Sequence, residues 1–466
     1  MEHCSFIERS NNIMELTIAV LGGLSFTFII YLVVHFRLLR NRELKMLDWF
    51  LLSMATFNGI GFSFVLWATN EGRNSAFNLI EFINNYDSSL IIMYILLSAV
   101  FVTCTVFGWY LTIGFYNNNK RQKKVYCSSD GQLVLKKINL VSWLMLIFAV
   151  VTYWLYTKVY GGFIAYLDYA NFIRSGVFNL QNPYSFLQRF GSLSFFSSFI
   201  FFALLIDKEN KKILNRKLVY MGLLCSVCFS LYVLYSWVGR VSIVVYISTF
   251  FLGYILYLNK SIFSFVRKII IFSFITLCLL VLTDSILGRT GDNKGIVEFF
   301  TGELSFPIAT FYSVSMLSHY RWFIDIIVAP LYLLPSRIWS GFFDIETASS
   351  FNTFLISGAR KGESDVLGEI PVDIMSFSFM QGNILGVVIV GFMWGSALYI
   401  LQRLISKIPV KSIRSILYAN IIINIAIMST LYGDPQHIIV RNFHMIVGFI
   451  ILSLCLKFSF NNKKIV

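Results

Sequence analysis

The residues of this chain best suited to chemistry are a few acids and arginines that interrupt long apolar stretches. The segment SDVLGEIPVDIMSFSFMQGNILG, residues 364–386, places Asp365, Glu369 and Asp373 directly before a long apolar run. A carboxylate in a partly dry pocket gains basicity by desolvation and can then take a proton from a hydroxyl group. Glu369 and Asp373 would share one face of a helical turn, and Glu369 is our candidate base. The alternative is a solvated helix N-terminus, where the helix dipole favours acids.

Arginine is the side chain suited to a diphosphate, because its planar guanidinium stays charged and offers a fork of donors. Arg240, in YSWVGRVSIVVY, is the only charged residue of the apolar stretch 218–258, so we expect it near a membrane surface. The alternative is an interfacial arginine that holds lipid phosphate. Four further candidates for diphosphate binding follow later in the chain: Arg289, Arg321, Arg337 and Arg360.

A second small site is LYGDPQHIIVRNFH, residues 431–444. If 437–444 is helical, His437, Arg441 and His444 fall on one face. We predict a phosphate-facing or aromatic-belt loop here in preference to a metal site. The chain has no Walker A motif, no G-x-S-x-G and no G-x-G-x-x-G after a strand, so energy-coupled transport and serine hydrolysis have no support.

The elements that must position these residues are membrane spans. The chain of 466 residues is 57% hydrophobic and 13% charged, whereas soluble domains carry roughly 25% charged residues. A span needs about 20 mainly apolar residues, and helices satisfy their own backbone groups in lipid. We therefore predict an all-α, polytopic membrane protein with about eleven transmembrane helices, within a range of ten to twelve. The predicted spans are 12–34, 46–67, 88–115, 138–157, 188–206, 218–237, 241–258, 269–288, 384–402, 416–432 and 443–457.

Lysine and arginine gather in alternate loops between these spans, such as those at 37–45, 120–137 and 403–414. Positive residues stay in the cytoplasm, so the pattern predicts an N-terminus outside the membrane and a C-terminus in the cytoplasm. The net charge of +14 then reflects topology and contact with anionic membrane lipids, and not nucleic-acid binding.

Three regions follow from the spans. Residues 1–288 hold predicted helices one to eight, 289–383 form a large external, periplasmic loop, and 384–466 hold the last three helices and a cytoplasmic tail. The loop alternates apolar and charged stretches, which predicts short helices on or in the outer leaflet. Its part RWFIDIIVAPLYLLP, 321–335, reads as re-entrant or interfacial. No internal repeat is visible, which weighs against transporters built from two related halves.

This layout resembles the O-antigen or capsule repeat-unit polymerases of the Wzy type, and more distantly the O-antigen ligases. VGR at 238–240 resembles the tight outer turn of a mid-chain hairpin in those families, and LGEIPVDIMSFSFMQGNILG at 367–386 resembles the segment that leaves their external loop. The paired Arg-x10-Gly motifs of some polymerases are absent. Glu369 stands where the ligases place a histidine, which favours polymerase over ligase.

The resemblance implies a GT-C-like bundle and a metal-independent membrane glycosyltransferase without a cofactor. Its substrate would be an oligosaccharide repeat on polyprenyl diphosphate, polymerised into capsular polysaccharide or the O-antigen of lipopolysaccharide, with a chain-length regulator protein as a partner. Arg240 and one or more of the loop arginines would bind the diphosphate, Glu369 would activate the acceptor hydroxyl, and His437 and Arg441 would line the same cavity. The alternatives are a polyprenyl-linked oligosaccharide flippase, a monosaccharide transferase with a polyprenyl phosphate donor, and an O-antigen ligase.

Overall fold

The computed structural model describes residues 2–70, 88–117, 130–175, 182–207, 214–258, 262–286, 296–317, 319–334, 338, 346–364 and 366–461. All regular secondary structure in these ranges is helical. Nine helices there are long and apolar enough to cross a membrane, and one bent pair makes a tenth candidate. The prediction of an all-α, multi-pass membrane protein is thereby confirmed.

The long helices follow the order of the predicted spans. The eighth predicted span, 269–288, corresponds to α11, whose side chains are described only in part and which is not among the nine span candidates. The described residues thus give nine or ten candidate spans, against the eleven that the sequence predicts. The elements are α1 (Glu2–Asn41), α2 (Met46–Met54) continued by η1 (Ala55–Gly61) and α3 (Phe62–Asn70), α5 (Ser88–Asn117), α6 (Asp130–Lys158), η2 (Ser185–Ser192) with α8 (Leu193–Ile206), α9 (Arg216–Ser236), α10 (Arg240–Leu258), α11 (Ile262–Ile286), α17 (Ile374–Ser406), α18 (Lys411–Ile421) with η5 (Ile422–Ile427) and η6 (Met428–Thr430), and the bent pair α19 (Pro435–Arg441) and α20 (Phe443–Asn461).

The connections carry short helices, as the sequence predicts for the late loop. α7 lies between α6 and η2, and the described part of the chain between α11 and α17 holds short elements as well. They are α7 (Phe163–Ser175), α12 (Ile296–Leu304), α13 (Phe306–Ser315), α14 (Ile324–Ile327), η4 (Ala329–Leu333) and α16 (Ala348–Ser357).

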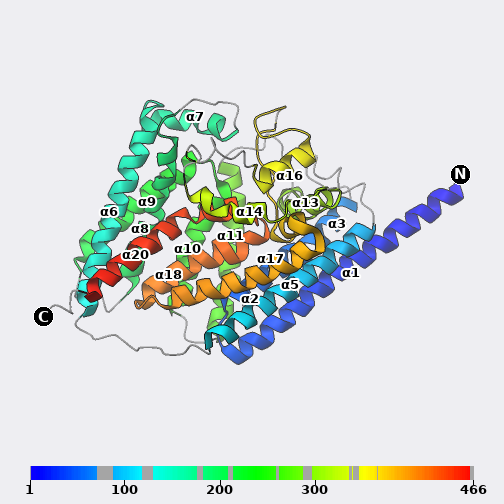
Figure 1. Cartoon of the computed structure of the whole chain (residues 1–466), viewed down its shortest axis with the longest axis horizontal. Helices are drawn as coiled ribbons and strands as arrows, with labels where there is room; N and C mark the ends of the chain where they lie inside the picture. The colour runs from blue at the N-terminus through cyan, green and yellow to red at the C-terminus, as the bar shows by residue number, and fades with distance from the viewer. Residues whose placement is uncertain are drawn as a thin grey trace.

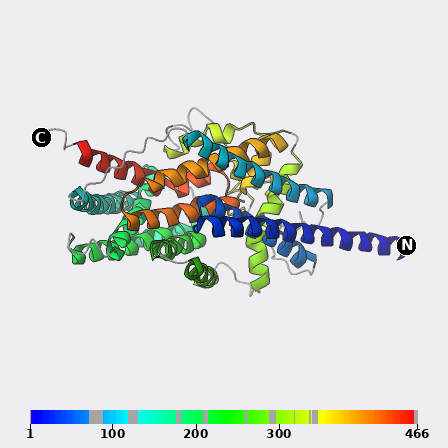
Figure 2. The same cartoon turned by 90° about the horizontal axis from the view of Figure 1, so that it is seen from below.

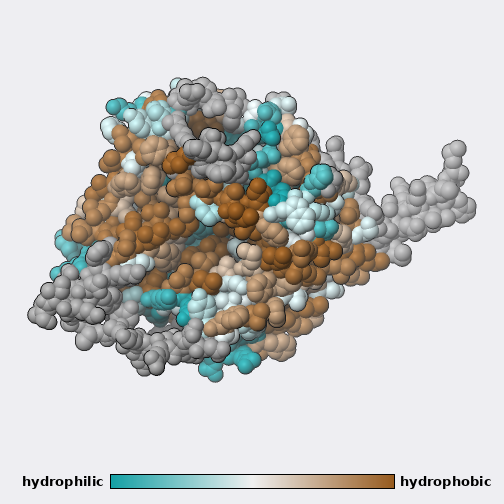
Figure 3. All heavy atoms as spheres, in the orientation of Figure 1, coloured by the Kyte–Doolittle hydropathy of each residue, from teal (hydrophilic) through white to brown (hydrophobic). Residues whose placement is uncertain are grey.

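The helical bundle has two unlike ends. The short helices α7, α13 and α16 lie toward the upper side of Figure 1, and we call this side the loop end. The α1–α2 and α17–α18 connections lie on the opposite side, the basic end, with Arg37–Lys45 and Arg403–Arg414. Hydrophobic side chains cover much of the face between the ends (Figure 3). Helix α1 projects beyond the rest of the bundle (Figure 2).

Helices α5 and α17 run side by side because glycines let their backbones meet. A Cβ at Gly395 would lie 1.9 Å from the carbonyl oxygen of Thr105, and one at Gly108 would lie 2.2 Å from that of Phe392. Gly391 and Gly395 form the small-xxx-small spacing that brings membrane helices together. This pair of helices supports the half of the bundle that carries the late loop.

Helix α17 is interrupted where the predicted span 384–402 begins. Gly382 has φ 176° and ψ 38°, and Asn383 has φ 56° and ψ −142°, so the helix divides into two halves. The first half, residues 374–381, is buried throughout. Because the break removes helical partners, the carbonyl oxygen of Met380 accepts instead from the backbone N–H of Arg321 at 3.0 Å. The side-chain amide of Asn383 donates to the Tyr320 hydroxyl at 2.8 Å.

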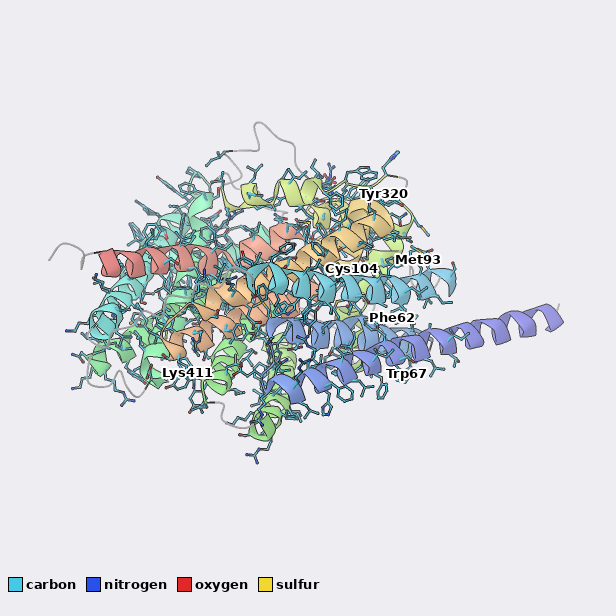
Figure 4. All side chains as sticks on the ribbon, turned by 60° about the horizontal axis from the view of Figure 1, so that its bottom comes forward. Phe62, Trp67, Met93, Cys104, Tyr320 and Lys411 are labelled. Carbon is cyan, nitrogen blue, oxygen red and sulfur yellow. The ribbon has the colours of Figure 1, made fainter. Side chains whose placement is uncertain are left out.

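Figure 4 shows Tyr320 beside α17 at the loop end, with Lys411 far away at the basic end. The break in α17 therefore ties the last part of the membrane bundle to the residue 320–325 turn of the preceding loop.

Gly395→Ala should destabilise the protein by about 1–3 kcal/mol, because its Cβ would overlap the α5 backbone and force the two helices apart. The melting temperature in detergent is the measurement. Gly114→Ala is the matched control, because nothing lies within 4 Å of a Cβ at Gly114. Equal melting temperatures for the two variants would contradict the close approach.

Candidate functional site

A buried ion pair lies at the loop end beside the break in α17. Arg321 Nε donates to Asp325 Oδ2 at 2.6 Å and Arg321 Nη2 donates to Asp325 Oδ1 at 2.7 Å. Asp325 is 1% exposed, and its Oδ2 also accepts from Gln381 Nε2 at 2.8 Å. Burial acts to lower the pKa of Arg321, but the hydrogen bonds and charge of Asp325 raise it overall. The guanidinium therefore stays charged although it is largely covered.

The turn that carries this pair is strained. Trp322 and Phe323 have φ values of 47° and 63°, which is uncommon for residues other than glycine. The backbone bonds of Arg321 to Met380 and of Ile324 to Arg321 hold this conformation. Its effect is to direct Arg321 and Asp325 inward while Trp322 is 64% exposed. Strain of this kind is retained where the surroundings fix it, and it clusters at functional sites.

Glu346 joins a second predicted arginine to this pair. Arg321 Nη2 donates to the Glu346 carbonyl oxygen at 2.6 Å, and Arg360 Nε donates to Glu346 Oε1 at 3.1 Å. Arg360 is exposed, and its guanidinium lies 6.0 Å from the ring centre of Phe354. Two of the four loop arginines that the sequence singles out, Arg321 and Arg360, are thus brought together.

The loop before α19 is pinned to the start of α17. The backbone N–H of Gly433 donates to the Val372 carbonyl oxygen at 2.6 Å. A Cβ at Gly433 would lie 2.3 Å from Ile374 Cα, so only glycine fits. The next residue, Asp434, caps α19 through the N–H of Gln436 and also accepts from the N–H of Ser349 at 2.9 Å. Burial raises the pKa of Asp434 to about 6.

His437 and Arg441 share Tyr432 as a common neighbour. The Arg441 guanidinium lies 3.9 Å from the ring centre of Tyr432, and the His437 ring centre lies 5.9 Å from it. His437 Nδ1 is also 3.3 Å from the Ser349 hydroxyl. Among the described residues, Arg441 has no carboxylate partner. Among the described residues its guanidinium is therefore not neutralised by an acid, unlike those of Arg321 and Arg360, and its donors are available for an anion.

His444 does not join this group. A 55° bend separates α19 from α20. Beyond the bend, the His444 ring packs with Phe195 and Phe199 at centre distances of 5.4 and 6.2 Å. The expectation that His437, Arg441 and His444 share one face is wrong for His444, because 437–444 is not one continuous helix.

The two acids before α17 also differ from expectation. The helix begins only at Ile374, and residues 369–373 are not helical, so Glu369 and Asp373 do not share a helical turn. Asp373 is buried and caps α17, with Oδ2 accepting from the N–H groups of Met375 and Ser376 at 3.2 Å each. Its Oδ1 has no hydrogen-bond partner among the described residues, and burial raises the pKa of Asp373 to about 7. Glu369 is exposed.

Arg240 is the first residue of α10, directly after a tight turn, as the sequence predicts. Its side chain is outside the described part, and Arg289 and Arg337 are outside the described residues altogether. The turn is strained at Val238, which has φ 52°, and Arg174 Nη1 donates to the Val238 carbonyl oxygen. The ring of Phe195 contacts both Trp237 and His444, so the turn lies near the α19–α20 bend.

We call the residues gathered at the loop end the polar centre. The sequence interpretation did not single out seven of its members: Arg189, Asp325, Glu346, Ser349, Gln381, Tyr432 and Asp434. Two had a local signal, since Asp325 stands four residues after Arg321 and Asp434 directly precedes Pro435, a common first helical residue. Arg189 Nη1 donates to the Tyr332 carbonyl oxygen at 2.7 Å, a contact with no local sequence signal. The polar centre consists of Arg189, Arg321, Asp325, Glu346, Ser349, Arg360, Gln381, Tyr432, Asp434, His437 and Arg441.

Comparison of the chain with protein-family models, with curated proteins and with solved structures found no match. The resemblance to Wzy-type polymerases thus stays a prediction from the residues themselves. Within the described part of the chain, no three His, Cys, Asp or Glu side chains are placed to share a metal ion. The polar centre combines guanidinium groups with an imidazole and buried carboxylates, which suits anion binding and proton transfer.

The raised pKa values of Asp373 and Asp434 predict that the protein loses stability as the pH rises. An unfolded aspartate titrates near 3.8, whereas the folded protein keeps these protons to about 7 and about 6. The folded state therefore binds more protons between these values, and the free energy of unfolding falls as the pH rises through that window.

Asp373→Asn keeps a capping oxygen and removes the ionisable group. We expect its melting temperature to change less than that of the wild type between about pH 4 and about pH 8, and the Asp373→Asn, Asp434→Asn double variant to change least. If the melting temperature of the double variant varied with pH as that of the wild type does, these two carboxylates would not be the source of the pH dependence.

Proposed function

We propose that this protein is a glycosyltransferase of the bacterial inner membrane that polymerises oligosaccharide repeat units carried on a polyprenyl diphosphate. Its product would be an O-antigen or capsular polysaccharide. The observation that supports this most directly is the gathering of Arg321, Arg360 and Arg441 at the loop end of a membrane-spanning bundle. With the basic end in the cytoplasm, the polar centre would face outward.

The polar centre suits a diphosphate at the membrane boundary. Arg441 offers donors that no described carboxylate occupies, and the Tyr432 ring beneath it fixes the guanidinium plane. Arg321 and Arg360 add positive charge nearby, although each is partly neutralised by an acid. In our proposal these arginines, together with Arg240, stabilise the charge that develops on the departing diphosphate.

An apolar surface beside the polar centre suits the lipid part of the substrate. Trp322, Ile324 and Ile327 are exposed on the 321–334 segment, with Ile327 73% exposed. Strongly hydrophobic atoms lie over α14 in Figure 3, next to paler, more polar ones. Ile384 and Leu385 are exposed directly after the break in α17. A polyprenyl chain lying on this surface would leave its diphosphate beside Arg321.

In the proposed reaction, the terminal hydroxyl of one repeat attacks the anomeric carbon of the growing chain. The bond from that carbon to the diphosphate oxygen breaks, and polyprenyl diphosphate leaves with both electrons. Glu369 takes the hydroxyl proton. Of the acids at the start of α17, Glu369 is open to a substrate, whereas Asp373 is buried under its own helix cap. The Glu369 segment packs on α16, since the Ile370 N–H donates to Thr353 Oγ1 at 2.8 Å.

The direct experiment uses purified protein in detergent, a polyprenyl diphosphate-linked repeat and a metal chelator. A ladder of products on a gel, with freed polyprenyl diphosphate detected by mass, would support the proposal. No ladder, together with movement of intact substrate across liposome membranes, would replace it with a flippase.

Arg441→Gln should lower the polymerisation rate by about 10²–10³-fold, because a donor aimed at developing charge is lost. The rate of Arg441→Lys should fall between those of the wild type and Arg441→Gln, since lysine keeps the charge but loses the planar fork of donors. The matched control is Arg216→Gln, at the basic end of α9, which should retain the wild-type rate. A wild-type rate for Arg441→Gln would exclude Arg441 from the reaction.

A further inference from the structure

A cavity of about 450 Å³ opens between α1 and α11 at the basic end, away from the polar centre. Its walls are mostly apolar. From α1 it is lined by Phe28, Tyr31 and His35, and from α11 by Val266, Ile269 and Ile270. Ile270 and Phe28 are well exposed, so the cavity is open at the side of the bundle. An open apolar cavity in a membrane-spanning bundle is suited to a hydrocarbon chain.

A basic residue flanks this cavity on α11. Arg267 follows the lining residue Val266 and stands beside the face formed by Val266, Ile269 and Ile270, whereas Lys268 falls on the opposite side of the helix. Leu44, a further lining residue, is followed by Lys45. Arg267 and Lys268 have no ion pair within the described residues. The nearby Arg37 is different, because its guanidinium is bound to Asp48 at 2.5 Å.

We propose that this cavity binds an anionic phospholipid of the cytoplasmic leaflet. Its acyl chain lies between α1 and α11, and its phosphate contacts Arg267. The apolar wall and the adjacent positive charge match the two parts of such a lipid. Basic pockets between membrane helices on the cytoplasmic side are a common site for anionic headgroups, and long basic side chains reach from a helix to the headgroup level. This site is independent of the proposed glycosyl transfer.

The test uses the protein in bilayer nanodiscs with a photoactivatable phosphatidylglycerol or the matched phosphatidylcholine at equal mole fraction. We expect labelling of residues 28–38 and 266–270 by the anionic lipid. Arg267→Gln should lower that labelling about 5-fold, since a basic residue near the surface adds about 1 kcal/mol to the attraction. Arg216→Gln, at the start of α9, is the matched control and should label as the wild type.

Three results would overturn the proposal. Equal labelling by both lipids, unaffected by Arg267→Gln, would show a groove for any acyl chain. Displacement of the label by polyprenyl phosphate but not by unlabelled phosphatidylglycerol would show that the groove holds a substrate tail. A size-exclusion profile of each variant confirms that it is folded. Ile269→Trp, which fills the cavity and keeps Arg267, should also lower anionic labelling. Unchanged labelling of that variant would place the lipid elsewhere.

Discussion

A helix that breaks within a membrane protein must return its unpaired backbone groups to protein partners, because lipid offers none. The break of α17 at Gly382 and Asn383 meets this constraint through the 320–325 turn, where the Arg321 N–H donates to the Met380 carbonyl oxygen. The strained turn, the buried Arg321–Asp325 pair and the Gln381 contact all depend on that arrangement. Without the break, the first half of α17 would continue straight. The polar centre would then lose Gln381, whose hydrogen bond to Asp325 joins it to the bundle.

Residues far apart in the sequence build the polar centre, and contacts to backbone groups fix several of the segments that carry them. Arg189 donates to the Tyr332 carbonyl oxygen, and the backbone N–H of Ser349 donates to the Asp434 carboxylate. The Gly433 N–H donates to the Val372 carbonyl oxygen. Such contacts fix positions without requiring side chains to pair with one another. Arg441 and His437 both lie against the ring of Tyr432.

The sequence was sufficient to predict helical membrane spans, because a run of about 20 apolar residues is enough to cross a membrane as a helix, whatever its tertiary contacts. It also placed Arg240 at a tight turn and Arg321, Arg360, His437 and Arg441 among the polar residues of the late chain. It failed where tertiary contacts decide the local conformation. The helix begins at Ile374 and not at Glu369, since Asp373 caps it and Val372 bonds to Gly433. The bend at Asn442 separates His444 from Arg441 for the same kind of reason.

The bond between Gly433 and Val372 has a consequence for biogenesis. Membrane proteins emerge from the ribosome from the N-terminus onward, at about 5–20 residues per second. When Arg321, Arg360 and the first half of α17 have been synthesised, Asp434, His437 and Arg441 have not, so Ser349 lacks its partner carboxylate. The nascent chain therefore inserts most of its spans before this centre exists. Any activity that needs Arg441 begins only after the loop before α19 has docked, which delays chemistry until the membrane bundle is nearly complete.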